Sequence, residues 1–376
     1  MVDFFGVMLA VPLGLLLVDL VMRHPRIALR FYFGPAHFYY ERNPLIPKTL
    51  RHTPKVDIRA GVTGNLSYIL GRKRKDHPVR FATDQYGYRN LIAPHSPLPE
   101  TLLLGNCFFN ASKTDQDKIL AARLAARGHQ CYTIAVDSIN LWEEVVNLKY
   151  HLATNPQLTA VKRVVWAVFE GNDLEGEFRP ETEPAQVMAG LRKRLAVRLE
   201  NYYKRSVLRR LFKILFARRK HHGMVLFRDF FGKEMLFFEP YVQMLSRTAD
   251  EVRNHRNYRA VQQIFAVMAE EAAKRDMEVL CLFIPVKPRV YDWVLQGAEP
   301  WSLPVQRAAF ADFVEDLCRQ HGFSFLDSTP HLHHGAKEVY AERGEVLYWL
   351  DDTHWSHEGI DIAATLLDRY LPREKP

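Results

Sequence analysis

Three short polar motifs carry residue types that could together perform acyl transfer. The first is Gly105-Asn106-Cys107, at the end of an apolar run and ahead of a helical pattern. The thiol of Cys107 is a candidate nucleophile, and the N-terminus of a following helix is expected to lower its pKa. The backbone amide of Cys107 is a candidate donor to an oxyanion.

The other two motifs supply the remaining groups of such a site. Gly171 and Asn172 follow a very apolar run, and the side-chain amide of Asn172 could donate to an oxyanion on a substrate carbonyl. His354 follows Asp351 and Asp352. A carboxylate at that spacing can orient an imidazole that takes a proton from the nucleophile. The sequence therefore predicts a Cys-His-Asp triad, with either Asp351 or Asp352 as its acid.

Alternating strand and helix patterns predict the scaffold that positions these motifs. Apolar strand-like runs occupy residues 101–107, 131–136, 161–169, 278–286 and 323–326. Helical patterns occupy residues 116–127, 140–153, 258–274, 304–321 and 356–371. This alternation predicts a three-layer α/β/α sandwich with a mostly parallel sheet. Ligands bind such sheets at the carboxyl ends of the strands, which is where the motifs fall.

The 376 residues divide into three parts. Residues 1–24 are expected to form a membrane anchor, because the segment from Phe4 to Val18 is apolar and uncharged. Residues 25–96 are expected to form an irregular lead-in with short strands. Residues 97–376 are expected to form the α/β domain, interrupted by a helical insertion at 175–256. The arginines that follow the anchor favour a cytoplasmic domain.

A basic stretch at residues 191–222 lies within this insertion. Its only acidic residue is Glu200, and its apolar residues recur at helical spacing. It is typical of a basic amphipathic helix, which either docks on the core or contacts a membrane surface. The net charge of +8 indicates an anionic surface or substrate. Nucleic acid is not expected as a partner, because no motif that reads bases accompanies the charge.

The remaining cysteines and histidines do not suggest a metal site. Cys131, Cys281 and Cys318 lie in apolar strand or helix patterns and are expected to be buried thiols. The cluster of His331, His333 and His334 has no carboxylate or thiol at metal-ligand spacing, and a solvated loop is expected there. No metal is predicted, and acyl transfer through a thiol requires no cofactor.

The three motifs, in this order, resemble those of the SGNH (GDSL-like) superfamily. Its members carry Gly-Asp-Ser after the first strand, Gly-x-Asn-Asp after a later one, and Asp-x-x-His near the C-terminus. The segment from Asp84 to Asn90 is similar to one that precedes the first motif in membrane-anchored members. The general family pattern implies Asp351 as the triad acid. The string from Asp352 to Ser356 is similar to the histidine motif of the polysaccharide acetylation branch, which implies Asp352 instead.

Four departures from the family pattern affect the site. Asn106 replaces the aspartate of the first motif, and Cys107 replaces its serine. Glu170 stands where a glycine is expected before Gly171. The glycine of a further family motif, which normally gives a backbone oxyanion donor, has no counterpart in residues 136–140.

The resemblance implies an ester hydrolase or O-acyltransferase acting on an acylated glycan or lipid. The alternative is a catalytically degenerate binding or scaffold module in an envelope assembly. The resemblance allows a periplasmic domain, so the side of the membrane stays open. The ester, the acyl acceptor and the oligomeric state also stay open.

Overall fold

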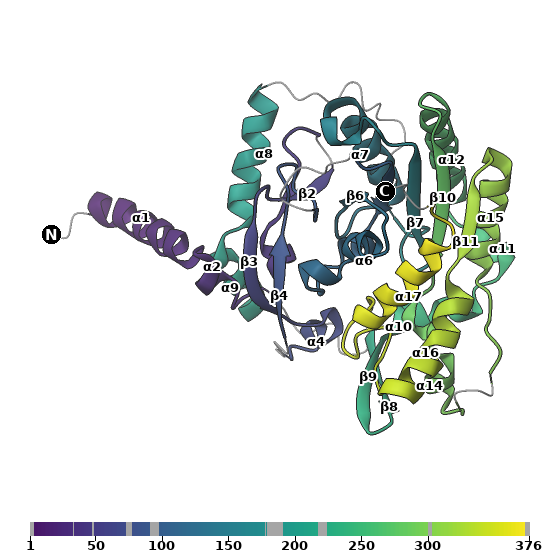
Figure 1. The fold of residues 1–376 in the computed structure, drawn as a ribbon. Helices are drawn as coiled ribbons and strands as arrows, with labels where there is room; N and C mark the ends of the chain where they lie inside the picture. Colours follow the sequence, from purple (N-terminus) through teal and green to yellow (C-terminus); the bar gives the residue numbers. More distant parts are fainter. Residues whose placement is uncertain are drawn as a thin grey trace.

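A five-stranded parallel sheet forms the centre of the protein (Figure 1). The structure is a computed structural model that describes residues 4–32, 34–46, 49–72, 77–90, 98–176, 178, 191–216, 224–299 and 303–372. The strand order is β11-β10-β7-β5-β6, and every pair is parallel. The strands are β5 (Thr101–Gly105), β6 (Cys131–Ala135), β7 (Arg163–Phe169), β10 (Glu278–Ile284) and β11 (Ser324–Asp327).

Helices cover both faces of this sheet, which explains why its strands are almost continuously apolar. One face packs against α7 (Leu141–Thr154), α12 (Tyr258–Ala273) and α15 (Ala309–His321). The other packs against α6 (Leu120–Ala125), α16 (Thr329–Arg343) and α17 (His357–Asp368). The predicted α/β class with a mostly parallel sheet is confirmed. Short elements at the edges are η1 (Gln116–Lys118), η2 (Pro156–Leu158), η5 (Met244–Ser246), α13 (Lys287–Val290) and α14 (Asp292–Gln296).

The strand order reverses between β5 and β7. From β5 the chain moves outward to β6, and it then crosses back to β7 on the other side of β5. In open parallel sheets this reversal opens a crevice at the carboxyl ends of the two strands, where ligands bind. Cys107 follows β5 and Asn172 follows β7, so the topology places both beside this crevice.

Helix α16 was not expected from the sequence. The prediction of a solvated loop around His331, His333 and His334 is wrong, because these residues form part of this helix. A proline lies in its first turn, and Gly344 ends it with a φ of 66°, which are common start and stop signals. His333 is buried, with Nε2 3.4 Å from a carboxylate oxygen of Asp292.

The lead-in contains two antiparallel strand pairs rather than one continuous element. Strand β1 (Tyr40–Arg42) pairs with β2 (Leu50–His52), and β3 (Asp57–Val62) pairs with β4 (His77–Ala82). Three short helices lie among them, α2 (Pro25–Ala28), α3 (Pro35–Phe38) and α4 (Asn65–Ile69).

The expected helical insertion also contains a β-hairpin between its helices. Helices α8 (Leu191–Lys204) and α9 (Val207–Phe216) cover most of the basic stretch, whose residues 217–222 lie outside the described residues. The hairpin of β8 (Val225–Phe230) and β9 (Lys233–Phe238) follows. Phe231 and Gly232, with φ of 50° and 76°, form its two-residue turn. Helices α10 (Glu239–Gln243) and α11 (Ala249–Arg253) complete the segment.

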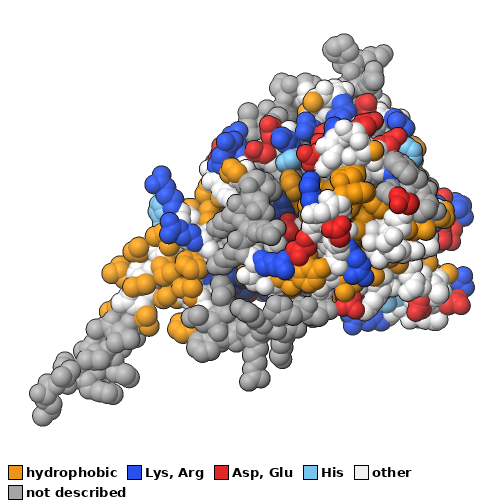
Figure 2. Space-filling model, turned by 90° about the horizontal axis from the view of Figure 1, so that it is seen from below, with side chains coloured by type: hydrophobic (Ala, Val, Ile, Leu, Met, Phe, Trp, Pro, Cys, Tyr) orange, Lys and Arg blue, Asp and Glu red, His pale blue; other side chains and the backbone are white. Residues whose placement is uncertain are grey.

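The N-terminal helix α1 (Phe4–Met22) carries exposed apolar side chains between Leu13 and Val21, and Figure 2 shows them on a segment that projects from the body. Asp19 interrupts the apolar sequence. Its carboxylate accepts hydrogen bonds from Arg23 and from the backbone of Leu208 in α9. No helix in the described ranges combines the length and apolarity that crossing a bilayer requires. The membrane anchor expected at residues 1–24 includes residues 1–3 and the side chains of residues 4–12, which lie outside the description, so it stays a prediction.

Glu170, at the end of β7, forms a buried ion pair with Arg289 of α13. Two guanidinium nitrogens donate to its carboxylate at 2.5 to 3.0 Å, and both side chains are 3% exposed. We predict that Glu170→Gln lowers the free energy of unfolding by roughly 3–5 kcal/mol, because it leaves a buried guanidinium uncompensated. The measurement is denaturant unfolding.

Glu278→Gln is the matched control for this prediction. It breaks the pair with Arg163, which joins the N-terminal ends of β7 and β10 but has a carboxylate that is 73% exposed. We expect a loss of about 1 kcal/mol or less. Equal losses in the two variants would contradict a structural role for the buried pair.

Candidate active site

Cys107 is the first residue of α5 (Cys107–Asn110), which begins directly after β5. Asn106 caps this helix, because its Oδ1 accepts a hydrogen bond from the backbone amide of Phe108 at 3.2 Å. A Cβ on Gly105 would lie 2.7 Å from the Cβ of Ala167. Glycine at 105 therefore lets β5 and β7 approach closely beneath the thiol.

His354 is oriented by Asp352. The Nδ1 of His354 lies 2.5 Å from Oδ1 of Asp352, and the backbone amide of His354 donates to the same oxygen at 3.0 Å. The other carboxylate oxygen of Asp352 accepts from the backbone amide of Asn65 at 2.6 Å. With Nδ1 held by the carboxylate, Nε2 is the ring nitrogen left for proton exchange.

Asp351 has a different role. Its carboxylate accepts from the backbone amide of Gly64 at 3.2 Å, and its carbonyl accepts from the amide of Leu66 at 3.1 Å. These contacts bind the N-terminus of α4. Of the two candidate acids, the structure thus places Asp352, and not Asp351, against the imidazole.

The Cys107 thiol and the His354 imidazole each change the pKa of the other, and the thiol donates a long hydrogen bond, 3.9 Å, to Oδ1 of Asn106. Burial raises the pKa of Cys107, although the charge of His354 opposes this rise. Burial would lower the pKa of His354, but Cys107 and Asp352 together raise it well above its usual value. The expectation that a helix N-terminus lowers the thiol pKa is wrong here, because α5 has only four residues and burial dominates.

Asn172 lines a cavity of about 610 Å³ that opens beside the end of β7. Its Oδ1 is buried and has no hydrogen-bond donor within the described parts of the chain. A Cβ on Gly171 would lie 2.4 Å from the ring of Phe169 and 2.8 Å from the ring of Tyr241. Gly171 therefore lets these two rings pack where the chain leaves the strand. Tyr241 and Asn172 both line the cavity.

Asp173 links the first and second site motifs. Its Oδ2 accepts from the backbone amide of Phe169 at 2.7 Å and from Nδ2 of Asn106 at 3.5 Å. Asn106 therefore acts as a donor where the family has an aspartate. Burial raises the pKa of Asp173 to about 7, and Glu144, also buried, has a pKa raised by burial and by the charge of Asp173.

Ser138 lies in the segment where the family has a further glycine. Its φ is 60°, in the left-handed region that favours glycine. Asp137 beside it accepts a hydrogen bond from Nδ2 of Asn110 at 2.7 Å. The backbone thus takes a glycine-like conformation without a glycine.

Sequence reasoning missed the groups that hold the Asp352–His354 loop. Lys287 donates to the backbone carbonyls of Leu236, Trp349, Leu350 and Asp352 at 2.8 to 3.2 Å. Lys113 donates to the carbonyl of Thr63 at 2.9 Å, and burial lowers its pKa although Asp352 opposes this shift. Lys287 directly follows the apolar run of β10, so the sequence could predict its position at the sheet edge. It could not predict which carbonyls Lys287 binds.

The structure thus combines a five-stranded parallel sheet, covered by helices on both faces, with the first two motifs directly after β5 and β7. No protein-family model and no curated protein sequence matches the chain. Among solved structures, it is similar to a lipolytic protein of the G-D-S-L family from Desulfitobacterium hafniense DCB-2. The identity is 12%, the TM-score is 0.35, and the match covers 72% of this chain and 98% of that one.

Two further structures are similar at the same level. One is a lipase/acylhydrolase from Enterococcus faecalis, with 12% identity, a TM-score of 0.34, and coverage of 74% of this chain and 100% of that one. The other is an acetyl xylan esterase, with 9% identity, a TM-score of 0.35, and coverage of 72% and 99%. These similarities concern the fold and not the substrate.

Asp173 gives a pH dependence that can be measured. Because burial raises its pKa from an ordinary value near 4 to about 7, the native state binds the proton more tightly than the unfolded state. Asp173 therefore contributes a negative slope to the dependence of the unfolding free energy on pH between about 4 and 7. In Asp173→Asn this slope should become shallower, because the amide carries no titrating proton. Denaturant unfolding across this pH range tests it, and an unchanged slope would contradict it.

Lys287→Met should destabilise the loop that carries Asp352, because four carbonyls lose a charged donor. We expect the free energy of unfolding to fall by roughly 2–4 kcal/mol. Lys274→Met is the control, since that side chain is 58% exposed and its partner Glu271 keeps its pairs with Lys149 and Arg275; we expect a change within about 0.5 kcal/mol. Thermal or denaturant unfolding compares the two, and similar effects in both variants would contradict this role.

Proposed function

We propose that the protein is an SGNH-like ester hydrolase or O-acyltransferase that works through a Cys107-His354-Asp352 triad. One observation carries the proposal: the buried Asp352 carboxylate holds Nδ1 of His354 at 2.5 Å, and the charge of the same imidazole acts on the Cys107 thiol. This is the order of groups that nucleophilic acyl transfer requires. The position of Cys107 and Asn172 at the reversal between β5 and β7 supports the same assignment.

In the first half-reaction the Cys107 sulfur attacks the ester carbonyl. His354 takes the thiol proton as the S–C bond forms, and the carbonyl π electrons move to oxygen. Collapse of this tetrahedral species breaks the C–O ester bond, and His354 returns the proton to the departing alcohol. The product is a thioester on Cys107. Asp352 stabilises the imidazolium that exists between the two proton transfers.

In the second half-reaction the thioester is transferred to an acceptor. His354 takes a proton from water or from a sugar hydroxyl, whose oxygen attacks the thioester carbonyl. The C–S bond then breaks, and the proton returns to sulfur. Water gives hydrolysis, and a hydroxyl gives acyl transfer. We propose an acylated glycan or lipid as the donor.

The developing oxyanion needs donors aimed at it. We propose the Cys107 backbone amide and the side-chain amide of Asn172 for this role. The support is that Asn172 lines the cavity at the end of β7 and follows the strand that pairs with β5, which ends just before Cys107. Removing one such donor typically slows acyl transfer by about 100- to 1000-fold.

The test uses purified full-length protein and 4-nitrophenyl acetate, with the acyl adduct followed by intact mass. We expect wild-type protein to gain one acetyl group that neutral hydroxylamine removes, as it does from a thioester. Cys107→Ala should abolish the adduct, and His354→Ala or Asp352→Asn should slow its formation by about 100-fold or more.

Cys131→Ala is the matched control, because Cys131 is a buried thiol on the neighbouring strand β6. It should label at the wild-type rate. Labelling that survives Cys107→Ala, or that is indifferent to His354→Ala, would defeat the triad and leave a binding module with an inert thiol.

A further inference from the structure

A basic cavity lies between the lead-in and the start of the insertion, outside the triad. Its volume is about 250 Å³. Four aromatic or imidazole side chains of the lead-in form one wall. Lys204 and Arg205, at the end of α8, and Arg209 and Arg210, in α9, form the other. The residues of the first wall are Tyr32, His37, Phe38 and Tyr40.

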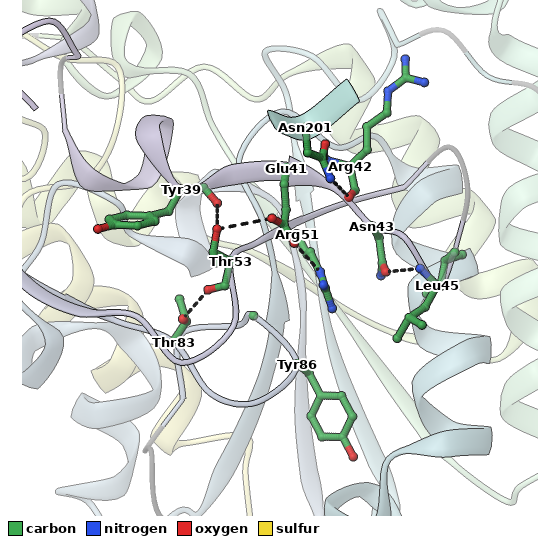
Figure 3. Close-up of polar contacts among 12 residues, drawn as sticks. Tyr39, Glu41, Arg42, Asn43, Leu45, Arg51, Thr53, Thr83, Tyr86 and Asn201 are labelled. Carbon is green, nitrogen blue, oxygen red and sulfur yellow. Dashed lines mark hydrogen bonds and ion pairs between the residues drawn. The ribbon is translucent and has the colours of Figure 1, made fainter. Parts of the chain in front are cut away.

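Two carboxylates near this cavity form ion pairs with Arg205 and Lys204, which line it. Glu41 binds Arg205, and Figure 3 shows its carboxylate also facing Arg51, at 3.0 Å. Glu200 binds Lys204 at 2.7 Å. Asn201 of α8 holds β1 through the backbone of Arg42 (Figure 3). These contacts hold α8 against the lead-in, and they leave both Glu41 and Glu200 paired with cations.

Arg209 and Arg210 are not neutralised in this way. Within the described ranges, no carboxylate lies at ion-pair distance from either guanidinium. Arg210 instead donates to the hydroxyl of Tyr68 and lies over the rings of Tyr32 and Tyr68, 5.1 and 5.3 Å from their centroids. Arg209 lies over the ring of Tyr203 at 4.7 Å. Two fixed positive charges thus meet in a concave site that no acidic side chain lines.

The cavity is close to the proposed reaction centre. His37 lines it, and this ring is held neutral: burial lowers its pKa well below the usual value, as do the nearby positive charges of Lys113, Arg210 and His354. One side chain therefore lies near both the arginines of the cavity and the imidazole of the triad. The lead-in, which forms one wall of the cavity, also binds Asp352 of the triad through the backbone amide of Asn65.

We propose that this cavity binds a phosphate group carried by the ester substrate. Arg209 and Arg210, which pair with no carboxylate of the described residues, match the nearly two negative charges of a phosphate at neutral pH. A guanidinium can also donate two parallel hydrogen bonds to phosphate oxygens. A volume of about 250 Å³ admits one charged group and not a polymer. This inference deepens the proposed function, since it names the chemistry of the same substrate.

The first test measures binding of inorganic phosphate to the full chain by calorimetry, at an ionic strength held constant with chloride. We expect Arg209→Gln to weaken binding about tenfold or more, because it removes a charge-assisted contact. Arg210→Gln should do the same, but Arg209 is the safer site because Arg210 also packs on two rings. Arg319→Gln is the control, being 72% exposed on α15, and should bind like wild type.

The second test separates this inference from the triad. Cys107→Ala should bind phosphate as wild type does. Wild-type protein should hydrolyse acetylated glycerol phosphate with a kcat/KM about tenfold above that for glyceryl monoacetate, and Arg209→Gln should remove only this preference. Turnover without phosphate binding would overturn the cavity alone, whereas binding without turnover would overturn the triad alone.

A third experiment distinguishes binding of phosphate in the cavity from general attraction of a basic surface to anions. Vesicles of phosphatidylglycerol and of phosphatidylcholine are compared in the same assay. Retention on anionic vesicles with no measurable binding of inorganic phosphate would overturn the cavity, because the basic side chains would then act as a surface patch. Binding of phosphate that Arg209→Gln and Arg319→Gln weaken equally would overturn it as well.

Discussion

The Asp352 carboxylate is fully buried, and a buried charge survives only where several groups compensate for lost water. His354 and the amide of Asn65 supply hydrogen bonds, and the charge of Lys113 adds to them, so that the pKa of Asp352 is held far below its usual value despite burial. These groups come from separate parts of the chain. The lead-in, the first motif and the C-terminal loop must therefore fold together before the imidazole is oriented.

The same constraint explains why the insertion is not a detachable addition. Lys287 binds a carbonyl of β9 together with three carbonyls of the loop around Asp352, and the amide of Leu236 donates to the carbonyl of Leu350 at 2.8 Å. Because the ammonium group is buried, desolvation lowers the pKa of Lys287 to about 7, although the charges of Asp352 and Asp351 oppose this shift. The hairpin thus forms one wall of the pocket that holds the loop.

The sequence predicted those features that depend on local pattern. Five strands and their order of appearance follow from apolar runs, and the sheet edge fixes where Cys107, Asn172 and His354 must lie. It could not choose between Asp351 and Asp352, because that choice depends on α4 reaching the loop from almost 290 residues earlier in the chain. It also missed α16 and the β8–β9 hairpin, since polar histidines and an aromatic turn weaken the usual helical and hairpin signals. Glu170 departs from the family pattern in the second motif, and its role depends on a partner, Arg289, that the sequence alone does not identify.

The replacement of serine by cysteine is consistent with the electrostatics of this site. Burial disfavours the thiolate, whereas the imidazole beside it favours a charged pair. The titrations of Cys107 and His354 are therefore coupled. A serine hydroxyl, with a far higher pKa, would leave the imidazole neutral at rest. Asn106 in place of an acid fits this view, because a carboxylate next to the sulfur would oppose thiolate formation, while a neutral amide caps α5 and satisfies Asp173 without adding charge. The two substitutions in the first motif are thus a matched pair, each reducing the electrostatic cost of the other.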